Sequence, residues 1–409
     1  MSSQKKVLLL SSGQPSLNPR LVKEADALCA AGYAVTVLYA YWNKWGTAKD
    51  DKLLPQKNWQ ALRIGGHPVH KPITYFFSRM LHKLSVLFAQ KFKIAFFNEW
   101  AAARGSYFLI REAKRHKADL YIGHNLGALP ATVKAAKIHQ RPCGFDAEDF
   151  HRYEVSDDRT DSSVILKTAI ENKYIPRVNY LSASSPAICQ AYHDLYPALS
   201  PVSILNVFPV EESVPCPRTA KTATIKLFWF SQTVSPARGV KDCIDALRFI
   251  NNPAIELHLL GYADDETRQQ LIVFASDSVT LVFHHPVAPD EIIPLASSFD
   301  IGLATEHRVP RNRDICLTNK IFTYLQAGLA IIASDTVAQQ ALMSDYPGAG
   351  LIYKNGNMQS LAQAISYYFS NRDDLYTAKK TAHSIARLDL NWEKEGVKFL
   401  QLIKNTLVT

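Results

Sequence analysis

No stretch of this 409-residue sequence approaches about 20 uninterrupted apolar residues, the length that a bilayer-spanning helix needs. The apolar run near the amino terminus, Val7 to Leu10, is also too short for the core of a signal peptide. An apolar content of 47% with 20% charged residues is typical of soluble globular proteins. We therefore expect a cytoplasmic protein, and the length predicts two domains or one large domain.

The sequence signatures of several chemistries are missing. The six cysteines form no C-x-x-C pair, which favours buried reduced thiols over disulfides or a zinc site. The motifs G-x-G-x-x-G, G-x-x-x-x-G-K-[ST] and G-x-S-x-G are absent, which counts against nicotinamide enzymes, P-loop NTPases and α/β-hydrolases. There is also no D-x-D triplet for a metal-bound diphosphate. Basic residues at strand-to-helix loops of the second half favour metal-free binding of a nucleotide diphosphate.

The first half of the chain begins with a β-α-β pattern. The apolar run Lys6 to Ser11 predicts a strand, and Asn18-Pro19 predicts a capped helix that ends near Gly32. The run YAVTVLY that follows predicts a second buried strand. Further strands are expected at Asp119 to Gly123, Pro142 to Phe145 and Asn179 to Ala183. This spacing predicts a parallel sheet covered on both faces, over residues 1–205.

The same pattern starts again after a proline-rich stretch, residues 206–222, that we interpret as a linker. A helix is predicted over Val240 to Ile250, and strands at Ile225 to Phe230, Ile255 to Leu260, Val279 to Phe283 and Asp300 to Ala304. Residues 223–388 therefore form a second α/β domain in this prediction. Residues 389–409 are predicted to hold a last amphipathic helix, capped by Asn391, that packs back on the first domain.

Three loops that follow predicted strands are candidates for binding an anion, because ligands collect at the carboxyl ends of parallel strands, near helix N-termini. They are Ser11 to Arg20, Ser231 to Gly239, and Cys316 to Lys320. For the first of them, its single glycine leaves a plain loop and a binding loop equally open.

The segment LTNKIFTYLQAGLAIIASD, Leu317 to Asp335, resembles the donor-binding segment of GT-B glycosyltransferases, most closely those of glycosyltransferase family 4. FSQTVSPARGVKDCIDAL at Phe230 to Leu247 and LLG at Leu259 to Gly261 agree with that family in order and spacing. The first half adds VLLLSSG, YIGH at Tyr121 to His124, and FDAED at Phe145 to Asp149. The resemblance implies an α/β protein of the GT-B fold, with two Rossmann-like domains facing each other across a cleft.

The resemblance also implies roles for individual residues. Arg238 and Lys320 look like the two cations that hold the diphosphate and stabilise its growing negative charge. His124 resembles the family histidine that meets the donor sugar, while Asp146 and Glu148 are candidates to orient an acceptor hydroxyl or take its proton. The expected donor contacts are Gly13, Ser231, Gln232, Gly239, Gly261, Glu306, Arg313, Thr318, Asn319 and Thr323. The expected acceptor contacts are Asn18, Arg20 and Asp149.

Each of these residues also has an ordinary interpretation. Arg238 and Lys320 would then be solvated surface cations, His124 a core or surface histidine, and the carboxylates helix or loop caps. One departure from the family bears on whether the site is functional: Thr323 and Ile315 stand where the family commonly has two glutamates. A threonine cannot accept hydrogen bonds from two ribose hydroxyls as a carboxylate does. Glu306 is a possible substitute contact for the ribose.

The basic residues are concentrated in one segment, Lys71 to Lys117, which carries ten of them against Glu99 and Glu112 and interleaves them with aromatic side chains. This composition is typical of an element that lies on an anionic membrane. It is equally typical of a pair of helices that pack in the core and expose their lysines to solvent. Nucleic acid binding is a third alternative, but no motif for it accompanies the charge.

These observations together predict a glycosyltransferase that moves a sugar from a nucleotide diphosphate sugar, which we expect to be a UDP-sugar, to a hydroxyl of a glycan or lipid-linked glycan in cell-surface polysaccharide synthesis. The family resemblance implies a retaining reaction with no metal and no other cofactor. Two alternatives stay open: a nucleotide-sugar epimerase of the same architecture, and a non-catalytic glycan-binding scaffold.

Overall fold

The computed structural model describes residues 4–217 and 223–408, and the chain divides into two compact units. The first unit comprises residues 1–205 and 396–409, and the second comprises residues 206–395. Residues 218–222 of the expected linker lie outside the described residues. Among the described residues, no helix combines the length and the apolar character needed to cross a bilayer.

The first unit is built on a parallel seven-stranded sheet with the order β3-β2-β1-β4-β5-β6-β7. Its strands are β1 (Lys6–Ser11), β2 (Ala34–Ala40), β3 (Gln60–Ile64), β4 (Leu120–His124), β5 (Cys143–Ala147), β6 (Tyr180–Ala183) and β7 (Val202–Ser203). Its helices are α1 (Pro19–Ala30), α2 (Lys44–Leu53), α3 (Pro72–Val86), α4 (Asn98–Ala101), α5 (Ser106–Ala113), α6 (Leu129–His139), α7 (Ser162–Tyr174) and α8 (Pro186–Leu195).

The second unit repeats this plan with a parallel six-stranded sheet of order β10-β9-β8-β11-β12-β13. Its strands are β8 (Ile225–Thr233), β9 (Ile255–Tyr262), β10 (Thr280–His284), β11 (Ile301–Ala304), β12 (Ala330–Ser334) and β13 (Gly350–Tyr353). Its helices are α9 (Val240–Ile250), α10 (Asp265–Ala275), α11 (Ile292–Ala296), α12 (Arg311–Ile315), α13 (Asn319–Ala327), α14 (Val337–Asp345), α15 (Met358–Ser370) and α16 (Arg372–Leu388). The chain ends in α17 (Trp392–Val408).

Local sequence explains where several helices begin. The Asn18 side chain accepts a hydrogen bond from the Leu21 amide at the start of α1, and Pro19 occupies the first helical position. Gly32 takes a positive φ of 88° just past the end of that helix. At α17 the Asn391 side chain accepts from the Lys394 amide. The predicted caps at Asn18 and Asn391 are therefore confirmed.

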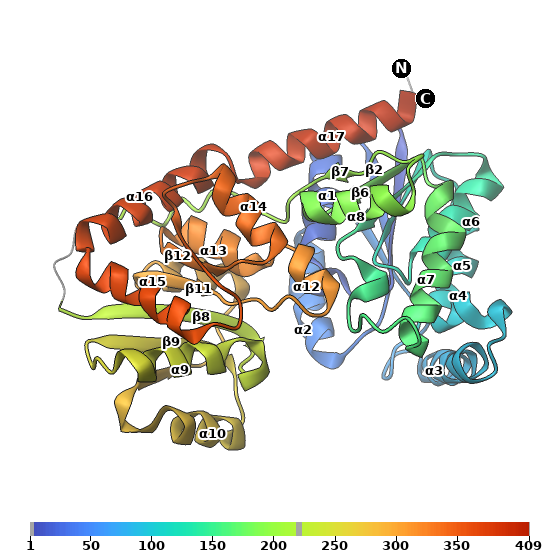
Figure 1. The fold of residues 1–409 in the computed structure, drawn as a ribbon. Helices are drawn as coiled ribbons and strands as arrows, with labels where there is room; N and C mark the ends of the chain where they lie inside the picture. Colours follow the sequence, from blue (N-terminus) through green and yellow to red (C-terminus); the bar gives the residue numbers. More distant parts are fainter. Residues whose placement is uncertain (1–3, 218–222, 409) are drawn as a thin grey trace. The chain divides into compact units, whose positions relative to one another are not determined.

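The end of α17 lies beside the start of β1 (Figure 1), where the Lys5 ammonium donates to the Leu407 carbonyl at 3.3 Å. This hydrogen bond joins the two segments of the chain that form the first unit. Four strands, β3, β7, β12 and β13, are not among those expected from the sequence, whereas every expected strand is present within a few residues of its predicted bounds.

The strand register brings polar side chains into one row at the carboxyl edge of the first sheet. Ser11 of β1 pairs with His124 of β4, His124 with Asp146 of β5, and Asp146 with Ser182 of β6. Because the strands are parallel, these four residues from distant parts of the chain end at the same level. The carboxyl ends of β8 and β11 form the corresponding edge of the second sheet.

Candidate functional site

The second unit contains a pocket of about 330 Å³ at the carboxyl ends of β8 and β11. Arg238 and Lys320 both border it, so the structure brings the two predicted cations to one cavity. The other lining residues are Phe230, Ser231, Gln232, Glu306, His307, Arg313, Thr318 and Asn319. Of these, Ser231, Gln232, Glu306, Arg313, Thr318 and Asn319 are also among the predicted donor contacts. We call this cavity the cationic pocket.

Lys320 is held in the cationic pocket by a carboxylate and an aromatic ring. It lies in the first turn of α13, directly after Asn319, and its ammonium is 2.8 Å from the Glu306 Oε1 atom. The same ammonium lies 5.4 Å from the centre of the buried Trp229 ring, a cation–π contact. The flexible lysine stem is therefore fixed with its charge at the start of a helix, where anions are favoured.

Glu306 is itself fixed from several sides. Its carboxylate accepts from Thr318 Oγ1 at 3.1 Å, and its backbone carbonyl accepts from Ser334 and Asn355. Burial would raise the pKa of Glu306, but Lys320 and Thr318 outweigh it and hold the pKa below its ordinary value. The carboxylate is therefore charged at neutral pH, and it offsets part of the positive charge of the pocket.

Arg238 is the more open of the two cations. Its side chain is exposed, and its Nη1 donates to Ser231 Oγ at 2.8 Å across the loop that follows β8. The next residue, Gly239, has a φ of 84° and is the N-cap of α9. A Cβ at residue 239 would meet the Thr305 carbonyl oxygen at 2.4 Å, so only glycine allows the close approach that aims Arg238.

Four predicted donor contacts do not line the cationic pocket: Gly239, which adjoins Arg238, and Thr323, Gly261 and Gly13. Thr323 lies on the buried face of α13 with 2% of its surface exposed, and its short side chain does not reach the cavity. Gly261 packs against the Ser231 carbonyl from β9 and supports the loop from behind. Gly13 belongs to the first unit, in the loop after β1, where its amide donates to Ser11 Oγ.

The first unit holds a buried charged cluster at the carboxyl ends of β4 and β5. His124 Nε2 lies 3.2 Å from the Glu24 carboxylate, and its Nδ1 lies 3.5 Å from Asp146 and 3.4 Å from Glu148. The Arg20 guanidinium donates to both carboxylate oxygens of Asp146 and to the Ile204 carbonyl. The structure thus brings together four predicted residues and adds Glu24.

The pKa values of the groups in this cluster are set by burial and by the neighbouring charges. Burial would lower the pKa of His124, but Glu24, Glu148 and Asp146 outweigh it and raise the pKa to about 10. Burial, and then the neighbouring Asp146, raise the pKa of Glu24. Burial would also raise the pKa of Asp146, but the positive charges of Arg20 and His124 outweigh burial and lower that pKa. His124 is therefore protonated at neutral pH.

Burial changes the roles expected for three of these residues. Arg20 is 2% exposed and both His124 and Asp146 are fully buried, so in this structure none of them offers a surface to a substrate. Asp146 also accepts from Ser182, which leaves its oxygens occupied. Arg20 and Asp146 form a buried ion pair that joins α1 to β5, and the acceptor contact predicted for Arg20 and the proton transfer predicted for Asp146 stay predictions.

The remaining predicted residues of the first unit lie nearer the surface. The Glu148 side chain is 25% exposed and accepts from the Asn18 amide group, so it connects the cluster to solvent. Asp149 is partly exposed, and its backbone carbonyl accepts from the Tyr192 hydroxyl. Glu148 is thus the carboxylate of this cluster that reaches solvent.

Glu24 is absent from the residues expected from sequence. It follows Arg20 by one turn on the face of α1 that buries Leu21, Ala25 and Leu28. A charged pair within an apolar helix face is a pattern that could have indicated a buried ion pair.

Within the part of the chain that the structure describes, one group of three or more His, Cys, Asp or Glu side chains has the spacing for a metal ion: Glu24, His124 and Asp146. Arg20 donates to Asp146 and lies 3.5 Å from Glu24. Its guanidinium already supplies positive charge between those carboxylates, so the donor set does not fit a resident cation.

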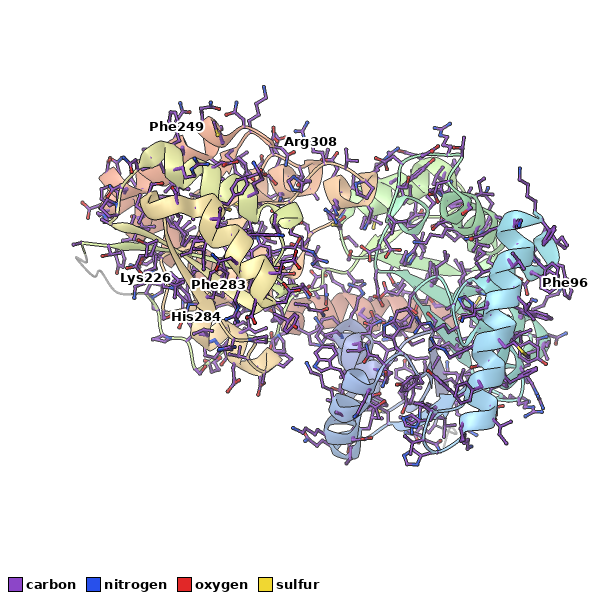
Figure 2. The ribbon with its side chains drawn as sticks, turned by 90° about the horizontal axis from the view of Figure 1, so that it is seen from below. Phe96, Lys226, Phe249, Phe283, His284 and Arg308 are labelled. Carbon is purple, nitrogen blue, oxygen red and sulfur yellow. The ribbon has the colours of Figure 1, made fainter. Side chains whose placement is uncertain are left out.

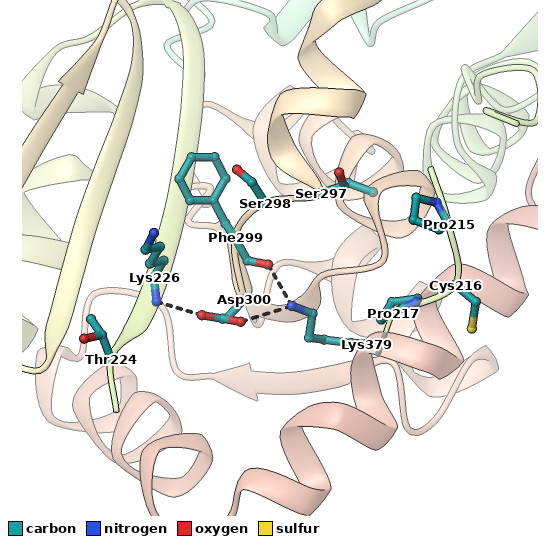
Figure 3. Close-up of a pocket in the computed structure, with 11 residues that line it drawn as sticks. Pro215, Cys216, Pro217, Thr224, Lys226, Ser297, Ser298, Phe299, Asp300 and Lys379 are labelled. Carbon is teal, nitrogen blue, oxygen red and sulfur yellow. Dashed lines mark hydrogen bonds and ion pairs between the residues drawn. The ribbon is translucent and has the colours of Figure 1, made fainter. Parts of the chain in front are cut away.

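A larger hollow of about 510 Å³ lies at the opposite, amino-terminal end of the second sheet (Figure 3). Lys379 there pairs with Asp300 at 3.1 Å and donates to the Phe299 carbonyl, while the Lys226 backbone amide donates to Asp300. Its charges are thus used to fasten α16 to the strand ends. Since ligands of parallel sheets collect at the carboxyl edge, the smaller cationic pocket is the better candidate site.

No protein-family model matches the chain, and no curated protein matches its sequence. Solved structures do match it over nearly its whole length. Anabaena HepE, in complex with UDP and glucose, has a TM-score of 0.69 at 17% identity, over 98% of this chain and 100% of that one. Sucrose-phosphate synthase from Thermosynechococcus elongatus has a TM-score of 0.67 at 14% identity, over 99% and 100%. A variant of S. aureus TarM, in complex with fondaparinux, alpha-GlcNAc-glycerol and UDP, has a TM-score of 0.68 at 10% identity, again over 99% and 100%.

The two parallel sheets and these similarities define the fold. The chain consists of two Rossmann-like units in tandem and has the fold of the GT-B glycosyltransferases. The predicted fold class is therefore confirmed.

Proposed function

We propose that this protein is a glycosyltransferase that moves a sugar from a UDP-sugar to a hydroxyl group of a glycan or lipid-linked glycan. The observation that carries the proposal is the meeting of Arg238 and Lys320 in one pocket at the carboxyl edge of the second sheet. The structural similarity to HepE, whose structure contains UDP and glucose, supports a uridine nucleotide as the donor carrier.

In the proposed reaction, the two cations bind the diphosphate and stabilise the charge that grows on it as the bond to the sugar breaks. Arg238 offers planar N–H donors, and Lys320 a fixed point charge at the start of α13. Such electrostatic stabilisation of a leaving group is usually the largest single contribution to this kind of transfer. We propose that no metal takes part, that anomeric configuration is retained, and that Glu148 orients the acceptor hydroxyl.

Calorimetry with UDP tests the proposal. Lys320→Ala and Arg238→Ala are each expected to weaken UDP binding about tenfold or more, because a hydrogen bond to a charged group contributes about 1.5–3 kcal/mol. Lys226→Ala is the matched control, since its exposed side chain lies at the other end of the same sheet. Equal affinity in all three variants would refute the assignment. No binding of UDP, GDP or ADP to the unaltered protein would favour the non-catalytic scaffold.

We further propose that the basic segment, residues 71–117, places the protein on an anionic membrane. The exposed apolar side chains of α3 and the turns after it support this, with Ile73 85%, Phe76 64% and Phe96 68% exposed. Phe96 lies at the outer margin beside α3 (Figure 2). Aromatic side chains of the segment also pack on one another, as Phe88 and Phe97 do with ring centres 4.9 Å apart.

Sedimentation with phosphatidylglycerol vesicles tests the membrane proposal. Phe76→Ser with Phe96→Ser should reduce the bound fraction severalfold, because each exposed ring contributes apolar area to the interface. The same pair of changes at Phe249 and Ile272, which are exposed on the second unit, is the control. Equal binding to phosphatidylcholine vesicles would contradict the role of the cations.

A further inference from the structure

The second unit has a groove of about 620 Å³ that is bordered by α9 and α10. Pro236 and Lys241 line one side of it, and Glu266, Val273 and Phe274 of α10 line the other. None of its lining residues borders the cationic pocket, so the proposed function leaves this groove unexplained. We call it the outer groove.

The last turns of α10 explain why the outer groove is apolar. Residues 271–275 read LIVFA, and a helical turn that is apolar at every position is expected to be buried on all sides. The unit buries Leu271 and Ala275 of this run but leaves Val273 70% and Phe274 38% exposed. An exposed apolar surface with a polar rim marks an interaction site. A part of α10 therefore awaits a cover that its own unit does not supply.

The beginning of α10 carries unbalanced negative charge. Asp264 is the N-cap residue, and Asp265 and Glu266 follow it in the first turn. Within residues 4–217 and 223–408, no lysine, arginine or histidine forms an ion pair with any of these three carboxylates. Their hydrogen-bond donors are neutral, as with the Gln270 amide group, which donates to Glu266 at 3.3 Å.

The other end of α10 lies beside unbalanced positive charge. The Lys241 ammonium is 4.6 Å from the centre of the Phe274 ring, so this lysine covers the last turn of the helix. Lys241 and Arg248 both pair with the single carboxylate of Asp245, at 2.8 Å and 3.8 Å. Two cations thus share one anion, and one positive charge remains at this end of the outer groove.

An acidic end and a basic end make this surface complementary to itself. In a dimer with twofold symmetry both copies offer the same face, and a residue at one end of the face meets the residue at the other end. Glu266, Gln270 and Phe274 are four positions apart and share one face of α10. When two copies of α10 lie antiparallel about an axis at Gln270, Phe274 with its Lys241 comes opposite Glu266 of the second copy.

We propose that the outer groove is the contact face of a symmetric dimer, in which Val273 enters the groove of the second copy and Lys241 pairs with Glu266 across the interface. The groove also borders Pro236, which begins the turn Pro236–Arg238. Contact at this proline would hold the turn that carries Arg238 into the cationic pocket. This last part rests on the proposed function, whereas the dimer itself does not.

Analytical ultracentrifugation without nucleotide, over a series of protein concentrations, tests the dimer. Lys241→Glu and Glu266→Lys should each raise the dissociation constant about tenfold or more, because each change brings like charges together. The double variant with both changes should restore the dimer, since the pair is then reversed. Lys226→Glu, at an exposed lysine of the same unit, is the matched control and should dimerise normally. Thermal unfolding confirms that each variant is folded.

Two further variants test the apolar contact and the position of the axis. Val273→Asp should separate the copies, because it places a charge in an apolar contact, whereas Ile138→Asp at an exposed apolar residue of the first unit should not. Gln270→Cys, in a chain with Cys216→Ser, should cross-link two copies under oxidising conditions. Gln340→Cys, at an exposed position of α14, is the control for this reaction.

The result that overturns the proposal is a monomer at every concentration. A dimer that is unchanged by the two charge reversals and by Val273→Asp also overturns it, because the interface then lies elsewhere. The proposed function fails separately, when the dimer forms as described but UDP does not bind. If UDP binds the monomeric Val273→Asp variant as tightly as the dimer, the dimer stands and the support of Arg238 is wrong.

Discussion

The Glu306 carboxylate lies 2.8 Å from the Lys320 ammonium, and both side chains are largely buried beside the cationic pocket. The pair connects the loop after β11 to the first turn of α13, and it keeps Lys320 in place before any ligand arrives. A bound diphosphate would share this lysine with Glu306. Repulsion between the diphosphate and the Glu306 carboxylate would therefore weaken the binding.

Glu306→Gln is therefore expected to strengthen the binding of inorganic pyrophosphate by roughly tenfold, because one negative charge near the anion is removed. The same change should lower the free energy of unfolding by about 1–3 kcal/mol, since Lys320 loses its charged partner. Calorimetry and urea unfolding measure the two effects. If UDP binding weakens while pyrophosphate binding is unchanged, Glu306 is instead a ribose contact.

Gly239→Ala should destabilise the loop that carries Arg238. The added Cβ meets the Thr305 carbonyl oxygen at 2.4 Å, in addition to the strain of a positive φ. We expect a loss of about 1–3 kcal/mol in unfolding free energy, together with weaker UDP binding. Gly356→Ala is the control, because residue 356 also has a positive φ but open space around it. The prediction fails if both variants lose the same amount.

Arg20→Ala should be strongly destabilising, by about 3–5 kcal/mol, because it leaves the buried Asp146 carboxylate without its cation. Lys57→Ala removes a surface ion pair with Asp26 and should cost only about 0–1 kcal/mol. Urea unfolding of both variants measures the difference. A similar small loss in both would show that the buried pair is not needed for the fold.

The stability contributed by His124 should depend on pH. Its pKa is about 10 in the folded protein and about 6.5 when unfolded, so the folded state binds the proton more tightly. This contribution is fully present below pH ~6.5 and is lost as pH rises through about 10. The difference in unfolding free energy between the unaltered protein and His124→Asn should therefore shrink over that range. A difference that grows with pH would contradict the protonated state.

Glu24→Gln gives a direct check on the same cluster. It removes the largest of the contributions that raise the His124 pKa, so the imidazole should titrate at a clearly lower pH. Nitrogen-15 NMR of the histidine ring measures the shift. An unchanged titration would mean that Glu148 and Asp146 alone hold the proton.

Much of the site could be predicted where its determinants are local in sequence. The loops that hold Arg238 and Lys320 were expected from the strand and helix patterns, and the resemblance to glycosyltransferase family 4 implied the roles of the two cations. The same holds for the caps at Asn18 and Asn391. These features depend on residues a few positions apart, whose geometry the backbone fixes.

The partners of these residues could not be predicted, because they come from elements that meet only when the sheets form. Glu306 reaches Lys320 from the end of another strand, and Glu24 reaches His124 from a helix 100 positions earlier in the chain. The residue pattern was enough to predict two α/β units and cations at strand ends. Which charges are buried, which are paired and which stay open followed from the folded structure, because burial and pairing depend on packing between distant segments.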